Sequence, residues 1–311
     1  MTSFTPDIAR IHASALRSIS RVVRETARPT PPDDALTATA DALRRGGALV
    51  LTGAGVSTDS GIPDYRGPAG SLTRGRPMTY QEFRHDPVAL HRYWARSFIG
   101  WRHMAGAEPN RTHHTLVELE RAGLITGIVT QNVDGLHTAA GSRTVIGLHG
   151  DLSVVVCLRC GTREPRPDLD RRLAAANPGY LECARAVGTG DVRPDGDIDL
   201  TPDIVTRFRL VGCIHCGSRL LKPDVVYFGE PVPTDRRATV NRLLHNSRAL
   251  VVMGSSLAVM SGYRIALDAG RAGLPLIVIN GGPGRADTRA DILWRTSVSD
   301  ASDLILDALE L

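Results

Sequence analysis

The chain has 311 residues, enough for one large domain with a small one or for two modest domains. Hydrophobic residues make up 42% and charged residues 23%, as in soluble globular proteins, and no apolar run approaches the roughly 20 residues that span a bilayer, so we expect no membrane segment. The formal charge of +4 is scattered over the sequence, which predicts a mixed, solvated surface and argues against nucleic acid as a partner.

Residues 1–33 are expected to form an N-terminal extension. Apolar residues from Ile8 to Val23 recur at helical spacing, which predicts a short amphipathic helix. The arginines and the scarcity of acids in this stretch are also typical of an organellar transit peptide. Asp7 and Glu25 fit an ordinary N-terminal helix of a cytoplasmic, bacterial protein, and we favour that interpretation.

Beyond the extension, strand-like and helical patterns alternate. The apolar runs cover residues 48–52, 124–130, 145–148, 249–253 and 276–280, and helical patterns cover 34–45, 112–122 and 234–247. This alternation predicts an α/β fold with a Rossmann-like, doubly wound parallel sheet. We assign residues 34–150 and 231–311 to the sheet domain. Residues 151–230, rich in Cys, Pro, Asp and Gly, are expected to form a smaller inserted domain.

A glycine-rich loop, GAGVSTDSGIPDYRG at residues 53–67, follows the first apolar run. Gly53 and Gly55 leave room for backbone N–H groups to approach a pyrophosphate. The usual dinucleotide fingerprint, however, has a third glycine where Thr58 stands and an acidic residue about 20 positions on, where arginines stand here. The loop therefore predicts a nicotinamide dinucleotide but not an ordinary dehydrogenase.

Two CxxC pairs lie in the small domain, Cys157/Cys160 and Cys213/Cys216. Their spacing predicts one tetrahedral Zn²⁺ site, and we favour zinc over disulfides because no secretory signal is evident. Since all ligand positions are filled, the metal is expected to be structural. A zinc-ribbon module that binds nucleic acid is the non-enzyme alternative, but it leaves the glycine-rich loop without a purpose.

Three further motifs, QNVDGLH at 131–137, LHG at 148–150 and GSS at 254–256, together with Asn280, make the chain resemble the sirtuin family over about residues 35–310. The stretches YWARSFIGW, PDGDIDL and SSLAVMSGYR resemble its class II branch, which includes mitochondrial, lipoamidase-type members. The resemblance implies an NAD-dependent protein-lysine deacylase. In such enzymes the acyl oxygen attacks C1′ of the nicotinamide ribose, nicotinamide leaves, and an alkylimidate forms.

The resemblance also implies roles for individual residues. His149 matches the catalytic histidine, a task suited to an imidazole with an ordinary pKa of about 6.5. Asn132 is expected to assist it and, with Gln131, to hold the ribose, while Asp134 holds the nicotinamide carboxamide. The remaining expected cofactor contacts are Gly53, Ala54, Gly55, Ser57, Ile62, Asp64, Tyr65, Arg66, Gly254, Ser255, Ser256, Asn280 and Gly281, with a looser match at Val298.

The expected substrate is an acylated lysine of a protein. Its backbone is expected to add as a strand along Val226, Phe228, Gly229 and Glu230, opposite the loop near residues 256–259. Tyr93 and Arg96 form a Y-x-x-R pair that resembles the motif holding acidic acyl groups in desuccinylating sirtuins. The alternative is that this pair lies on a helix surface.

Residues 177–199 match a class II insertion that is expected to reach the mouth of the active site. A mono-ADP-ribosyltransferase that uses the same NAD site is the enzymatic alternative. The sequence does not indicate the preferred acyl group, the protein target or the oligomeric state.

Overall fold

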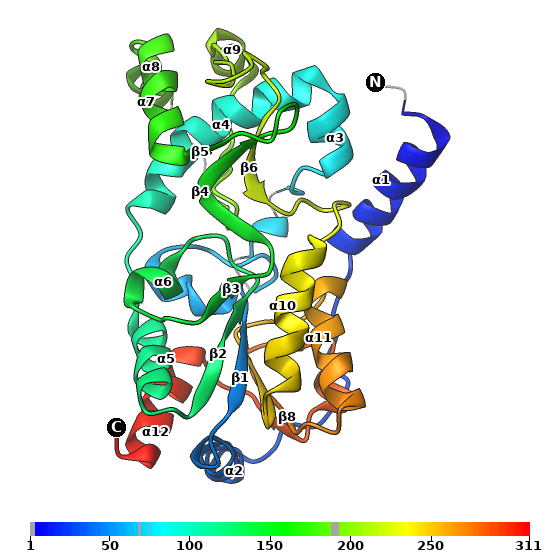
Figure 1. The fold of residues 1–311 in the computed structure, drawn as a ribbon, viewed down its shortest axis with the longest axis vertical. Coiled ribbons are helices and arrows are strands. Elements are labelled where there is room, and N and C mark those ends of the chain that lie inside the picture. The colour runs from blue at the N-terminus through cyan, green and yellow to red at the C-terminus, as the bar shows by residue number, and fades with distance from the viewer. Residues whose placement is uncertain (1–3, 68–69, 74, 188–192) are drawn as a thin grey trace.

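The computed structural model describes residues 4–67, 70–73, 75–187 and 193–311, and it shows two units stacked along the long axis (Figure 1). The larger unit contains a six-stranded sheet in the order β3-β2-β1-β7-β8-β9, with all neighbours parallel. Its strands are β1 (Ala48–Thr52), β2 (Ile125–Thr130), β3 (Val145–Gly147), β7 (Ala249–Met253), β8 (Leu276–Ile279) and β9 (Ile292–Trp294). The predicted doubly wound parallel sheet is therefore confirmed.

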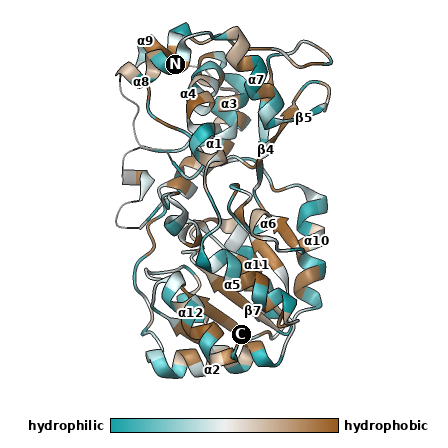
Figure 2. Ribbon diagram, turned by 90° about the vertical axis from the view of Figure 1, so that its left-hand side faces the viewer, coloured by the Kyte–Doolittle hydropathy of each residue, from teal (hydrophilic) through white to brown (hydrophobic). Residues whose placement is uncertain are grey.

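Helices cover both faces of this sheet because its strands bury apolar side chains on both sides. Figure 2 shows these strands coloured as hydrophobic. One face packs on α2 (Pro32–Arg44), α5 (Arg111–Arg121) and α12 (Val298–Leu309), and the other packs on α10 (Thr234–His245) and α11 (Met260–Arg271). In β1, Val50 belongs to the first core, whereas Leu49 and Leu51 belong to the second. The chain order reverses between β1 and β7, and such a switch point is where open α/β sheets bind ligands.

The smaller unit contains a three-stranded antiparallel sheet in the order β5-β4-β6. Its strands are β4 (Gly150–Cys157), β5 (Arg163–Pro165) and β6 (Leu221–Val225), and its helices include α7 (Arg166–Ala176), α8 (Tyr180–Val187) and α9 (Pro202–Arg207). Sequence analysis recognised none of these helices, because their apolar faces are short.

Two helices from between β1 and β2 also pack in the smaller unit, α3 (Tyr80–His85) and α4 (Pro87–Ala105). Phe83, Trp94 and Phe98 share a core with Val155 and Leu221, and the Trp94 indole N–H donates to the Leu221 carbonyl at 2.9 Å. The unit is thus assembled from two separate stretches of chain, whereas the sequence boundaries placed all of it in residues 151–230.

The N-terminal extension contains α1 (Pro6–Ile19), which lies beside α3 at the junction of the two units (Figure 1). Ala15 and Ile19 are buried there. From Ile19 the chain continues without regular structure to the edge of the large sheet, where the Thr30 N–H donates to the Leu293 carbonyl at 2.8 Å. A short helix, α6 (Leu136–Ala140), follows β2. Within the described ranges, no helix has the length and apolar character needed to cross a membrane.

Candidate active site

A cleft of about 2140 Å³ lies at the carboxyl ends of β1, β2 and β7 and is lined by loops of both units. This volume exceeds the 300–1,000 Å³ or so that is typical of small-molecule pockets, so the cleft has room for two substrates. Every residue that sequence analysis assigned to catalysis or to the cofactor lines it, and so does Val298. Of the six expected substrate residues, Arg96 alone does not line it.

The glycines of the loop after β1 allow two strand ends to meet. A Cβ at Gly53 would lie 2.7 Å from the Ser255 Cβ, and one at Gly55 would lie 2.9 Å from the Gly254 Cα. Gly254 itself has a φ of +61°, a left-handed conformation that favours glycine. These glycines therefore allow the two loops to pack together at the floor of the cleft. This packing is a second reason for glycine here, besides the expected approach of a pyrophosphate.

Short polar side chains connect the loops after β1 and β2. The buried Ser57 hydroxyl donates to an Asp134 carboxylate oxygen at 2.8 Å, and the Asn132 amide donates to the Ser57 oxygen at 3.0 Å. The same amide donates to the Gly53 carbonyl at 3.1 Å. Burial raises the pKa of Asp134, and the bonds from the Leu136 N–H and Ser57 oppose that rise. We call Ser57, Asn132 and Asp134 the ribose-end network, after the ribose that sequence analysis expects at this end of the cleft.

Gln131 lies between the ends of β1 and β7. Its amide nitrogen donates to the Ser255 hydroxyl oxygen at 2.8 Å and to the Thr52 carbonyl at 3.3 Å. Any side chain at Gly262 in α11 would collide with the Gln131 carboxamide. The orientation of this carboxamide is therefore fixed by three elements that come from distant parts of the sequence.

His149 lies just after β3 and is half-buried in the cleft. Its Nδ1 is 2.9 Å from the Gln131 carbonyl oxygen, and its Nε2 is 2.7 Å from the Ser261 hydroxyl. Because a carbonyl oxygen only accepts, Nδ1 carries the proton and Nε2 accepts from Ser261. Burial lowers the pKa of His149 to about 4, although the bond to the Gln131 carbonyl opposes the shift. The pKa of His149 thus lies below the ordinary value of about 6.5 that sequence analysis assumed, which favours the neutral imidazole at pH 7.

The loop that precedes α3 forms one wall of the cleft. Ile62 is buried, and the Asp64 carboxylate accepts from the Gly67 N–H at 2.9 Å. The Arg66 guanidinium donates to the Ile19 carbonyl at 3.2 Å, so this wall is joined to the end of α1. Sequence analysis did not foresee that contact, nor that residues 16–23 line the mouth of the cleft.

The expected peptide-binding segment continues from β6. The Val226 N–H donates to the His149 carbonyl at 2.7 Å, which joins this segment to the expected catalytic histidine. Glu230 accepts from the Tyr227 N–H at 3.0 Å and forms an ion pair of 3.2 Å with Lys222, the only lysine of the chain. The segment and residues 256–259 both line the cleft.

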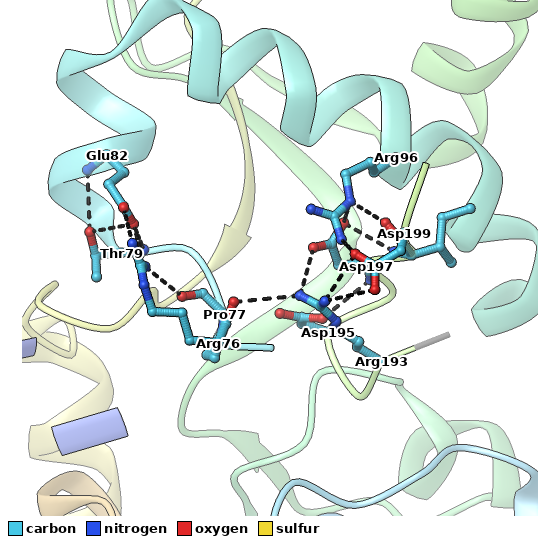
Figure 3. Close-up of polar contacts among 10 residues, drawn as sticks. Arg76, Pro77, Thr79, Glu82, Arg96, Arg193, Asp195, Asp197 and Asp199 are labelled. Atoms are coloured by element: carbon cyan, nitrogen blue, oxygen red, sulfur yellow. Dashed lines mark hydrogen bonds and ion pairs between the residues drawn. The ribbon is translucent and has the colours of Figure 1, made fainter. Parts of the chain in front are cut away.

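The Tyr93/Arg96 pair is divided between two environments. Tyr93 lines the cleft and contacts the Tyr227 ring edge to face, with centroids 5.8 Å apart. Arg96 points into the insertion, where it forms ion pairs with Asp197 and Asp199 and donates to the Ile198 carbonyl (Figure 3). The two side chains therefore do not meet in the cleft, and the guanidinium already has its carboxylate partners.

The four cysteines of the CxxC pairs come together in the small unit, with all four sulfur atoms within 4.8 Å of one another. Cys157 Sγ lies 3.6 Å from Cys216 Sγ, and Cys160 Sγ lies 3.7 Å from Cys213 Sγ. Tetrahedral Zn–S bonds of about 2.3 Å require sulfur separations of about 3.8 Å. These sulfur atoms fit a zinc ion, and they lie apart from the cleft-lining residues.

Comparison with known proteins agrees with this geometry. A model of the Sir2 family matches residues 53–261. The chain is 66% identical over 269 residues to NAD-dependent protein deacetylase 1 of Corynebacterium efficiens, covering 86% of this chain and 95% of that protein. It is 41% identical over 268 residues to NAD-dependent protein deacylase Sirt4 of Drosophila melanogaster, covering 85% and 84%.

Among solved structures, one described as "Sir2-p53 peptide-NAD+" is similar with a TM-score of 0.68 at 29% identity, covering 88% of this chain and 97% of that one. Fold and site together define a Rossmann-like protein with an inserted four-cysteine unit. The chain belongs to the Sir2 family, the sirtuins. Membership makes NAD its co-substrate, and the clustered cysteines fit the structural zinc ion.

Proposed function

We propose that the protein is an NAD-dependent protein-lysine deacylase that releases nicotinamide and transfers the acyl group to ADP-ribose. The observation that carries the proposal is the neutral His149, whose tautomer is fixed beside the ribose-end network. The names of the relatives support NAD and acylated proteins as substrates. A structural neighbour described with a deacetylated p53 peptide and 3'-o-acetyl ADP ribose supports acyl transfer to ADP-ribose.

NAD, when bound, supplies the glycosidic bond whose cleavage drives the transfer. A ribose hydroxyl replaces the Ser261 hydroxyl, which lies 2.7 Å from His149 Nε2, and His149 accepts the ribose proton at that nitrogen. The Gln131 carbonyl keeps the proton on Nδ1 throughout, so the acceptor nitrogen does not change. A positioned general base of this kind contributes about 10²–10⁴-fold in rate.

The ribose-end network prepares the cleft for the sugar and the carboxamide. Ser57 holds Asn132 and Asp134 in fixed orientations before any ligand enters, so little reorganisation is needed on binding. The protein substrate adds its backbone between residues 228–230 and 256–259. Main-chain hydrogen bonds supply most of its affinity, so we expect loose sequence preference around the acyl-lysine.

The test incubates the protein with NAD and an acetyl-lysine peptide and measures the products by mass spectrometry. We expect equal amounts of nicotinamide, deacetylated peptide and O-acetyl-ADP-ribose. His149→Ala should lower all three by about 10²–10⁴-fold. His245→Ala, an exposed position on α10, is the matched control and should retain wild-type rates.

Nicotinamide released with ADP-ribose attached to protein, and with the acetyl group intact, would support the mono-ADP-ribosyltransferase instead. Nicotinamide release that survives in His149→Ala would contradict the role of the histidine.

A further inference from the structure

A tight turn in the insertion, residues 193–197, presents a carboxylate to the cleft. Pro194 and Asp195 at its tip line the cleft together with Tyr93. The turn is closed by two backbone hydrogen bonds, from the Gly196 N–H to the Arg193 carbonyl at 2.9 Å and from the Arg193 N–H to the Asp197 carbonyl at 2.8 Å. Asp195 is half-buried at this position (Figure 3).

Helix α4 fixes the position of the turn. Gly196 has a φ of +72°, and its carbonyl packs so closely on Gly100 of α4 that any side chain at Gly100 would collide with it. One helical turn earlier, Arg96 donates to the Ile198 carbonyl. The same helix therefore accommodates the turn at a glycine and binds it through an arginine, so the place of Asp195 is determined by packing.

The two nearby arginines are engaged by other carboxylates. Arg96 Nε lies 3.1 Å from Asp197, and Arg193 lies 3.5 Å from Asp197 and 3.0 Å from Asp199. Among the residues that the structure describes, Asp195 forms no ion pair, and its carboxylate accepts from two backbone N–H groups, its own and that of Asp197 at 3.2 Å. The remaining acceptor positions of Asp195 are thus available to a group in the cleft.

Tyr65, Tyr93 and Tyr227 line the same cleft as the half-buried Asp195. Burial is the main cause that raises the pKa values of these three tyrosine hydroxyls, and the charge of Asp195 adds to the rise. Burial raises the pKa of Asp195 itself, while Arg193 and Arg96 oppose the rise. Arg166, buried against Trp94, lines a small pocket on the other side of Asp195 and does not line the cleft.

We propose that Asp195 sets the acyl preference: acyl chains long enough to reach it are accepted when they end in a neutral hydrogen-bond donor and rejected when they end in a carboxylate. The proposal rests on the proposed deacylase function. An ionised carboxylate only accepts hydrogen bonds, so an amide or hydroxyl donor forms a charge-assisted bond with it. A second carboxylate beside it in the cleft is repelled.

Two acyl groups of the same shape test the proposal. Succinyl-lysine ends in a carboxylate, and succinamoyl-lysine carries a carboxamide in its place. For the wild type we expect kcat/KM at least about tenfold higher for the succinamoyl peptide than for the succinyl peptide. In Asp195→Asn the repelling charge is gone while Arg166 and Arg193 remain nearby, so the ratio should fall to within about threefold of one or reverse.

The control variant is Asp203→Asn, which removes one negative charge from an exposed site on α9 and should keep the wild-type ratio. Turnover of an acetyl-lysine peptide shows that Asp195→Asn is folded and active. If that turnover persists and the succinamoyl-to-succinyl ratio is unchanged, the proposal is wrong. If the wild type turns over no acyl-lysine peptide, the deacylase function fails and the acyl preference fails with it.

Discussion

At the ribose end of the cleft, Ser57, Asn132 and Asp134 are joined by hydrogen bonds of 2.8–3.0 Å between short side chains that follow two neighbouring strands. At the acyl end, the groups behind the cleft wall are charged, and they come from α4 and from an insertion about 100 residues further along the chain. Under the proposed function, the first arrangement positions the ribose that every catalytic cycle uses. The second contacts the acyl group, which varies between substrates.

If the proposed function holds, this difference lets one cleft combine a constant reaction with an acyl preference that can vary. The ribose end is carried by the large sheet, whose strands are buried on both faces. The acyl end belongs to the smaller unit, which depends on the four-cysteine cluster and on α4 for its core. Three substitutions and one pH profile test this comparison, and they are given from the largest expected effect to the smallest.

Loss of the metal site should affect the acyl end most. We expect Cys213→Ala to abolish stoichiometric zinc and to unfold much of the smaller unit, because binding of structural zinc contributes about 10–16 kcal/mol in small zinc modules. Deacylation should be lost, whereas the secondary structure of the large sheet should persist in circular dichroism. Cys183→Ala, outside the cluster, is the control and should retain zinc. Full activity in the zinc-free variant would contradict this dependence.

Ser57→Ala should damage the ribose end alone. The change leaves the Asn132 amide and the Asp134 carboxylate without their common partner, at a cost of about 1–3 kcal/mol. We therefore expect kcat/KM to fall by roughly 5- to 150-fold for every acyl group alike. The control is Ser60, which does not line the cleft and whose hydroxyl accepts from the Asn110 amide at 3.0 Å. In Ser60→Ala, kcat/KM should stay within about threefold of wild type. A fall in kcat/KM for one acyl group alone would contradict the assignment of Ser57 to the ribose end.

Arg96→Met should lower stability more than it changes acyl choice. The change leaves Asp197 with Arg193 alone, so we expect the free energy of unfolding to fall by about 1–3 kcal/mol, less than for a fully buried pair because Asp199 is 58% exposed. Urea unfolding measures this, with the exposed Arg92→Met on the same helix as control. A selective loss of succinyl turnover, with stability unchanged, would restore the Y-x-x-R interpretation.

The pH profile carries the smallest expected effect. Because burial lowers the pKa of His149 to about 4, kcat/KM for the acetyl peptide should show no acid limb from this group between pH 5 and 7. An ordinary pKa near 6.5 would instead cost about thirtyfold at pH 5. The folded state binds the proton more weakly than the unfolded state, so the contribution of His149 to stability is lost as the pH falls below about 6.5.

The gathering of residues at the ribose end was predictable because they lie in short motifs. Gly53-Ala54-Gly55 follow one strand, and His149 follows another. Residues after parallel strands lie at the same edge of the sheet, so these motifs predict their own proximity. The zinc ligands were predictable for the same reason. Ser261 was missed because its contact with His149 spans 112 residues and depends on how α11 begins.

The acyl end was not predictable because its partners are distant in sequence. The spacing of Tyr93 and Arg96 predicted a shared site, but the side chains diverge once Asp197 and Asp199 neutralise the arginine. Nothing in the sequence indicates that Gly100 receives the Gly196 carbonyl, since that contact joins two separate segments. The position of α1 against α3 is a tertiary contact of the same kind.

The most direct test of the account is a crystal structure of the protein with NAD and an acetyl-lysine peptide. We predict that a hydroxyl of the nicotinamide ribose lies within about 3.2 Å of His149 Nε2, in place of Ser261, and that the peptide backbone runs between residues 228–230 and 256–259. A dinucleotide whose ribose lies beyond hydrogen-bond reach of His149, with the acetyl group bound elsewhere, would contradict the account.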